Sequence, residues 1–132
     1  MPRNPRLPDT NSILRYVLKD HREQFEVSQE FFEKVRTGKD RAILSESVLV
    51  ECVYVLSKFY RVPKKEASEI LSRLLLYKGV RNKDKEVLFR ALSIFSDKSV
   101  DIVDCILLAR SRQENVRLFS FDKGLKKLEQ QQ

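Results

Sequence analysis

The stretch VRLFSFDKGLKKL, residues 116–128, contains the clearest strand signal in the chain. Its first six residues, VRLFSF, are mostly apolar and bulky, as is typical of a short buried strand. The DKG that follows predicts a turn, and LKKLE predicts a short amphipathic helix. This part of the chain therefore predicts a strand that ends at Asp122 and leads into a helix.

Working outward, the same alternation of strand and helix recurs along the chain. Short strands are predicted before Asp9, at AILS (42–45) and at 80–83. Helices are predicted at 11–18, 22–36, 45–60, 63–78, 85–95 and 100–115, with Ser45 as an N-cap. This order favours an α/β fold with a parallel sheet. A length of 132 residues suits a single domain, residues 1–132.

Composition narrows the function classes further. The net charge of +7 favours an anionic partner such as nucleic acid or an acidic peptide. Cys52 and Cys105 lie in apolar segments and are expected to be buried free thiols in a reducing compartment. The N-terminal residues do not have the pattern of a signal peptide, and no apolar run approaches ~18 residues. A cytoplasmic protein without a membrane span is expected.

Four acidic residues stand apart from the charged surface clusters. Asp9 and Asp122 each end a predicted strand, and Asp104 lies in the apolar stretch IVDCILLA. Glu51 interrupts VLVECVYVL, so the pattern predicts that it is buried. A buried carboxylate costs several kcal/mol unless it is protonated, paired with a cation or bound to a metal.

Each acid also has an ordinary structural interpretation. Glu51 could form a salt bridge, and Asp9 could cap the first helix. Asp101 could cap a later helix with Asp104 three residues on, as in a capping box. Asp122 could be a turn residue before Lys123 and Gly124.

Taken together, the acids favour a shared site. In parallel sheets, ligands bind beyond the carboxyl ends of the strands, where these carboxylates would meet. All-oxygen ligands suit Mg²⁺ or Mn²⁺ rather than zinc. A metal-filled acidic pocket on a basic protein is typical of phosphodiester chemistry.

Four segments resemble the PIN-domain ribonucleases, and in particular the VapC-type toxins of toxin–antitoxin pairs. They are PDTNSILRYVL (8–18), SESVLVECVYVLSKFY (45–60), VDIVDCILLA (100–109) and LFSFDKGLKKL (118–128). The resemblance implies a three-layer α/β/α sandwich with a short-stranded, mainly parallel central sheet. It also implies an endoribonuclease that uses Mg²⁺ or Mn²⁺, an RNA substrate, a cognate antitoxin and a homodimer.

The resemblance also implies a set of site residues. The family's acidic set matches Asp9, Glu51, Asp104 and Asp122 as catalytic metal ligands, with Asp101 as a further metal ligand. Thr10 and Asn11 match its small polar residues after the first aspartate and would orient that carboxylate. The rival hypothesis is a non-catalytic PIN-like module that binds RNA or protein.

Two features depart from the family pattern. Pro5 and Pro8 flank the first predicted strand, which should therefore be very short or irregular. The basic segment VRNKDK (80–85) is either an RNA contact or a solvated loop.

Overall fold

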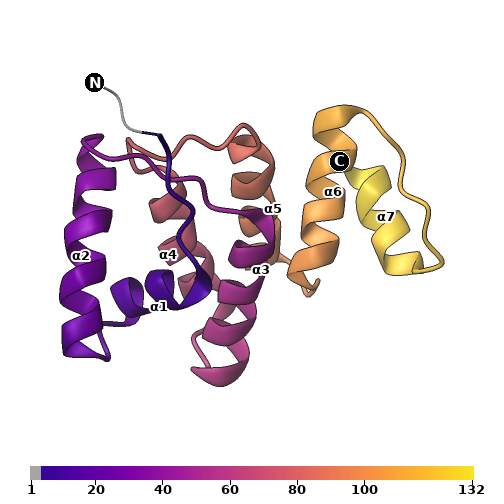
Figure 1. Cartoon of the computed structure of the whole chain (residues 1–132). Coiled ribbons are helices and arrows are strands. Elements are labelled where there is room, and N and C mark those ends of the chain that lie inside the picture. Colours follow the sequence, from indigo (N-terminus) through magenta and orange to yellow (C-terminus); the bar gives the residue numbers. More distant parts are fainter. Residues whose placement is uncertain (1–3) are drawn as a thin grey trace.

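The fold is built from helices, as a computed structural model of the chain shows for residues 4–132 (Figure 1). Seven α-helices and one π-helical turn follow one another within this range. They are α1 (Thr10–Leu18), α2 (Arg22–Thr37), α3 (Glu46–Tyr54), η1 (Val55–Phe59), α4 (Lys64–Leu75), α5 (Lys85–Asp97), α6 (Ile102–Glu114) and α7 (Lys123–Gln131). Each helix predicted from the sequence is therefore present, with bounds that differ by a few residues.

The predicted sheet is wrong. Residues 4–132 contain no β-strand, so there is neither a parallel central sheet nor a three-layer α/β/α sandwich. Three of the four predicted strands are reduced to two isolated parallel bridges, which join Arg6 to Ala42 and Ala42 to Val80. The chain segments run side by side there for one residue only.

Local chemistry explains why these bridges do not extend into strands. Pro5 and Pro8 have no backbone N–H to donate to a ladder, which limits pairing around Arg6, as predicted. At Leu44, two residues after Ala42, the Asn82 side chain makes the hydrogen bonds that a neighbouring strand would make. It accepts from Leu44 N at 2.8 Å and donates to Leu44 O at 2.7 Å. The backbone of Leu44 is thereby satisfied without a neighbouring strand.

The strand predicted at residues 116–121 is absent. This segment runs along the outer edge of the molecule between α6 and α7 (Figure 1). Its backbone is held by side chains, because Ser111 Oγ donates to Val116 O at 2.6 Å and Leu118 N donates to Glu129 Oε2 at 2.7 Å. Phe119 and Phe121 are about nine-tenths exposed and contact each other edge to face. The segment is apolar, as the sequence indicates, but within residues 4–132 no neighbouring strand pairs with its backbone.

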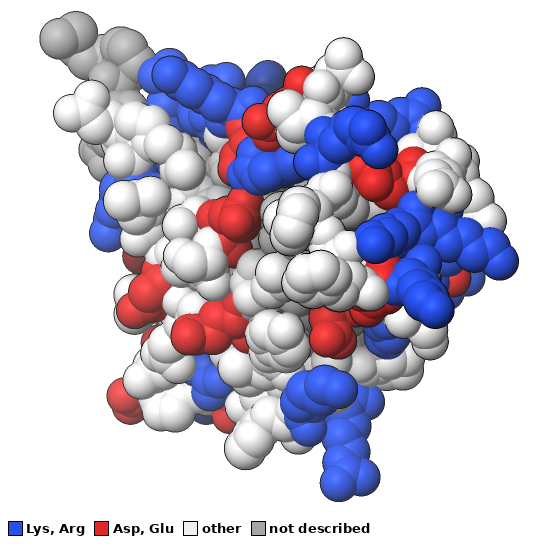
Figure 2. All heavy atoms as spheres, turned by 90° about the vertical axis from the view of Figure 1, so that its right-hand side faces the viewer, with Lys and Arg blue, Asp and Glu red and all other residues white. Residues whose placement is uncertain are grey.

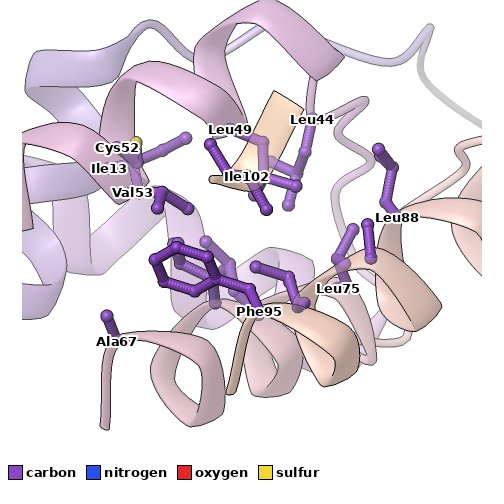
Figure 3. Packing of buried hydrophobic residues seen from close by; sticks show 14 of the residues in the cluster. Ile13, Leu44, Leu49, Cys52, Val53, Ala67, Leu75, Leu88, Phe95 and Ile102 are labelled. Atoms are coloured by element: carbon purple, nitrogen blue, oxygen red, sulfur yellow. The ribbon is translucent and has the colours of Figure 1, made fainter. Parts of the chain in front are cut away.

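The core lies between the helices that surround Ala42. α1 packs on α2, α5 packs on α4 and α6, and α3 contacts α1, α4 and α6. Side chains from five of these helices meet in it, as the close-up of Ile13, Leu49, Leu75, Phe95 and Ile102 shows (Figure 3). α6 and α7 form the opposite end of the molecule from α2 (Figure 1). Among residues 4–132, no helix has both the length and the apolar character needed to span a membrane.

Gly79 is the tightest point of this arrangement. Its N–H donates to Val35 O at 2.7 Å, and its carbonyl accepts from Ala42 N at 3.0 Å. A Cβ atom at this position would lie 2.0 Å from Asp40 O and 2.8 Å from Val35 O. Both neighbours are backbone atoms, so they cannot move aside as the end of a flexible side chain could.

We therefore expect Gly79→Ala to lower the free energy of unfolding by about 3 kcal/mol or more. The matched control is Gly124→Ala, where the added Cβ meets only the Asp122 side chain, at 3.3 Å. The control lies in a helix and should change stability by less than about 1 kcal/mol. Urea denaturation followed by circular dichroism measures both variants, and equal stability of the two would contradict this account of Gly79.

Candidate functional site

The predicted acids lie on or next to four different helices. Asp9 precedes α1, Glu51 lies within α3, and Asp101 and Asp104 are at the start of α6. Asp122 precedes α7, at the far end of the exposed segment. Among residues 4–132, no group of three or more His, Cys, Asp or Glu side chains is arranged to hold a metal ion. The structure thus does not gather the predicted ligands into one cluster.

Asp9 and Asp122 perform the same local task. Asp9 Oδ1 accepts from Ser12 N at 2.9 Å, and Asp122 Oδ1 accepts from Leu125 N at 2.9 Å. Each is the N-cap of its helix, which confirms the structural interpretation of Asp9 and assigns a second cap at Asp122. Each carboxylate keeps its second oxygen available for another ligand.

Among residues 4–132, the carboxylates of Glu51, Asp101 and Asp104 accept no helix-capping hydrogen bond. Glu51 is exposed, so the prediction that it is buried is wrong. Its side chain points away from the apolar residues of α3, whose buried members are Leu49, Cys52 and Val53. Asp101 occupies the N-cap position of α6 but accepts no capping hydrogen bond, and Asp104 is half-buried. Within the described residues, none of these three carboxylates forms an ion pair or a side-chain hydrogen bond.

Two buried thiols report which acids lie close together. Burial, together with the smaller effect of the negative charges of Glu51 and Asp9, raises the pKa of Cys52 to about 12. The pKa of Cys105 is also raised to about 12, mainly by burial; Lys64 opposes this rise, and Asp104 and Asp101 add to it. Asp9 and Glu51 therefore both lie near Cys52, and Asp101 and Asp104 both lie near Cys105. These are the two acidic pairs, and they lie on neighbouring helices, because α3, which carries Glu51, contacts both α1 and α6.

Lys64 is a residue that the sequence did not single out. Its Nζ donates to Lys98 O at 2.9 Å and to Val100 O at 3.3 Å, and it lies 4.3 Å from the centroid of the Phe95 ring. With Asp101 and Lys58 it lines a hollow of about 100 Å³ between α3, η1 and α6. A lysine in a basic segment gives no sequence signal for such a place, because the partner carbonyls lie more than thirty residues away.

A second hollow, of about 350 Å³, lies beside Asp9. Asn11 lines it and donates to Gln24 Oε1 at 3.4 Å, so its amide joins α1 to α2. Arg15 and Glu23 line the same hollow, and neither was expected there. Thr10 is the first residue of α1 and is half-buried. Asn11, but not Thr10, thus forms part of the wall of a cleft next to the Asp9 carboxylate.

The basic segment at residues 80–85 is mainly structural. Asn82 pairs with the backbone of Leu44, as described above, and also donates to Asp84 at 3.1 Å. Lys85 Nζ donates to Val80 O at 2.9 Å, so this cation closes its own loop. Arg81 and Lys83 are exposed. Of the two interpretations of this segment, the structure favours the loop.

The donor chemistry and the geometry give different answers about a metal ion. Carboxylate oxygens are the ligands that Mg²⁺ and Mn²⁺ prefer, and three of these carboxylates lack other partners. The arrangement, however, brings them together only in pairs. We therefore assign no chemical step to a bound ion.

The chain is similar in sequence to a protein family and to a named relative. The family model described as PIN domain matches residues 6–130. A VapC ribonuclease from Aquifex aeolicus (strain VF5) is 23% identical over 124 residues, which cover 93% of this chain and 91% of that protein. No solved structure matches the chain significantly. The resemblance seen in the sequence is confirmed at the level of the family.

Capping by Asp9 can be separated from any other role. Asn caps a helix about as well as Asp, whereas Ala does not. We expect Asp9→Ala to lower the free energy of unfolding by about 1 kcal/mol and Asp9→Asn to leave it nearly unchanged. Thermal or urea denaturation measures the difference. A loss of stability as large in Asp9→Asn as in Asp9→Ala would show that the carboxylate charge, not the cap, stabilises the fold.

The raised thiol pKa values predict a loss of stability in alkali. A thiol has an ordinary pKa near 8.5 when the chain is unfolded, and about 12 at Cys52 and Cys105 in the folded chain. Between these values the unfolded state has lost protons that the folded state still holds. Stability therefore falls as pH rises from about 9 towards 12, by about 2 kcal/mol per thiol at pH 10.

The control for this pH effect is the difference between variants. Cys52→Ala loses stability at every pH, but its curve should fall less steeply above pH 9 than that of the unaltered chain. Denaturant titrations at pH 7, 9 and 10 measure the slopes. Parallel curves would contradict a raised pKa at Cys52.

Proposed function

Because this chain belongs to the PIN domain family, we propose that it is an endoribonuclease that hydrolyses RNA phosphodiester bonds with the help of Mg²⁺ or Mn²⁺. The name of its relative, a VapC ribonuclease that matches nearly the full length of both chains, supports RNA as the substrate. The same relationship supports a role as the toxin of a toxin–antitoxin module. A cognate antitoxin and a homodimer are part of this proposal.

One structural observation carries the assignment of residues. Glu51 and Asp101 are exposed and Asp104 is half-buried, and none of the three forms an ion pair or a side-chain hydrogen bond within residues 4–132. With Asp9 they lie on or next to α1, α3 and α6, and α3 contacts the other two helices. Like charges held near one another raise the free energy of a fold, and a bound cation lowers it, so exposed carboxylates on contacting helices favour cation binding. A bound divalent ion would supply that charge and activate water.

The chain's own residues would act on the substrate in three ways. Glu51, Asp104 and the second oxygen of Asp9 would bind the ion, and Asp101 would extend this acidic surface. Asp122 belongs to the proposed set from the family pattern alone. Lys58 and Lys64, which share a hollow with Asp101, would hold an RNA phosphate beside the acids and offset the repulsion between carboxylate and phosphate.

A second candidate function is a PIN-like module that binds RNA without cutting it. One observation favours it: the five acids do not form a single metal-binding group within the described residues. The basic net charge would serve this function equally well. Both candidate functions require RNA binding, but only the nuclease requires the carboxylates.

The test is cleavage of a labelled RNA with Mg²⁺ or Mn²⁺ and with EDTA. Asp104→Asn should reduce cleavage by on the order of a hundredfold or more and leave the fold intact, because Asp104 caps nothing. Asp9→Asn should do the same while keeping its cap. Asp97→Asn is the matched control, since Asp97 is exposed and lies outside the acidic pairs.

Two outcomes would count against the nuclease. Full cleavage by both Asp104→Asn and Asp9→Asn would remove these carboxylates from the reaction. RNA binding without cleavage by the unaltered chain, under every divalent ion tried, would favour the binding module instead.

A further inference from the structure

A groove between α5, α6 and α7 has a chemistry opposite to that of the acidic pairs. It encloses about 330 Å³. Three cations line it, Arg90, Lys98 and Arg112, and its apolar walls are Ile94, Leu108 and Leu128. Two glutamine amides near the end of α7 complete the lining, which contains no Asp or Glu side chain.

The positions of these residues follow from helical periodicity. Arg90, Ile94 and Lys98 are spaced by four on α5, and Leu108 and Arg112 are spaced by four on α6. Residues four apart lie on one face of a helix, so two packed helices present both rows to the same groove. Leu128 of α7 closes it from the third side. Figure 2 shows the face that carries α6 and α7, where Lys and Arg side chains lie at the upper, right-hand and lower parts, with Asp and Glu side chains between them.

The charges in the groove are uncompensated. Within residues 4–132, Arg90, Lys98 and Arg112 form no ion pair, whereas other arginines such as Arg36 and Arg110 do. Arg90 Nε is buried and has no hydrogen-bond partner. Buried donors are normally satisfied, so Arg90 Nε is available to donate to a ligand in the groove. An anionic ligand would supply the acceptor.

We propose that this groove binds a phosphate-bearing nucleotide of a single-stranded RNA, at a point removed from the bond that is cut. The inference rests on the proposed function for the identity of the anion. The three cations hold the phosphate, and the sugar and base cover Ile94, Leu108 and Leu128.

The position of the groove favours RNA over an isolated anion. Arg112 lies two turns after Asp104 on α6, about 12 Å along the helix axis. A strand that passes the acidic pair at the start of α6 therefore reaches the groove within a few nucleotides. The groove would then hold the flanking part of the substrate while the acids engage the scissile bond.

The experiment measures RNA binding in EDTA, where no cleavage takes place. The full chain and the double variant Lys98→Gln/Arg112→Gln are titrated onto a fluorescein-labelled oligouridylate, and anisotropy is followed at several salt concentrations. The double variant should bind roughly tenfold more weakly, with a salt slope smaller by about 0.7, because one phosphate contact to a single strand contributes about 0.7. Both altered residues are exposed, so the fold should remain intact.

The matched control is Arg22→Gln/Lys39→Gln, which removes the same net charge from exposed positions on and just after α2. It should bind nearly as the unaltered chain does, since α2 lies at the opposite end of the molecule (Figure 1). Equal losses in both double variants would reduce the groove to a general charge effect and overturn the proposal. Unchanged binding by the groove variant would overturn it as well.

Two further arms identify the occupant. Uridine monophosphate should displace the RNA at lower concentration than inorganic phosphate, because only the former covers the apolar walls; equal potency would overturn the nucleotide assignment. A polyglutamate peptide is titrated in the same way. If its binding depends on Lys98 and Arg112 while RNA binding does not, the groove binds an acidic polypeptide and not RNA. Absence of cleavage, with the groove effect present, would reject the proposed nuclease but not this site.

Discussion

The structure depends on a close crossing of three chain segments at Ala42. Its N–H donates to Gly79 O, Arg81 N donates to its carbonyl, and Arg6 bridges to it from the other side. Ala42 is fully buried, so its backbone N–H and carbonyl cannot hydrogen-bond to solvent and must find partners within the protein. The absence of a side chain at Gly79 makes the approach possible. From this point the connections to α1, α3 and α5 leave in the directions that place the acids and the groove.

Packing around that crossing explains why the acids occur in pairs. Cys52 and Cys105 each lie beneath two carboxylates, and both thiols belong to the buried core. The apolar faces of α3 and α6 are fixed by this core, which turns the opposite faces, with Glu51 and Asp104, towards solvent. The carboxylates are thus held near one another by helices that pack for other reasons. Electrostatic repulsion between them is limited by exposure to water and, at Asp101, by Lys64.

The C-terminal part of the molecule has a different balance of interactions. α7 is tied to α6 by Glu129, which accepts from Leu118 N and from Ser111 Oγ at 3.3 Å. Its one buried side chain is Leu125, so polar contacts hold it as much as apolar ones do. This arrangement leaves Phe119 and Phe121 in solvent and opens the cationic groove beside Leu128. Arg110 anchors the other side of α6, where it pairs with Glu46, Asp84 and Glu114.

What the sequence determined by itself is the set of helices, the free buried thiols and the family, and it offered the cap at Asp9 as one of two interpretations. These depend on local periodicity, on side chains that reach their own helix, and on motifs that lie within short segments. Tertiary structure decided the rest. An apolar run such as residues 116–121 becomes a strand only if a neighbouring strand accepts its backbone, and here Glu129 and Ser111 do so instead. The exposure of Glu51, the role of Lys64 and the convergence of Arg90 with Arg112 depend on how helices distant in sequence are oriented, which no local pattern specifies.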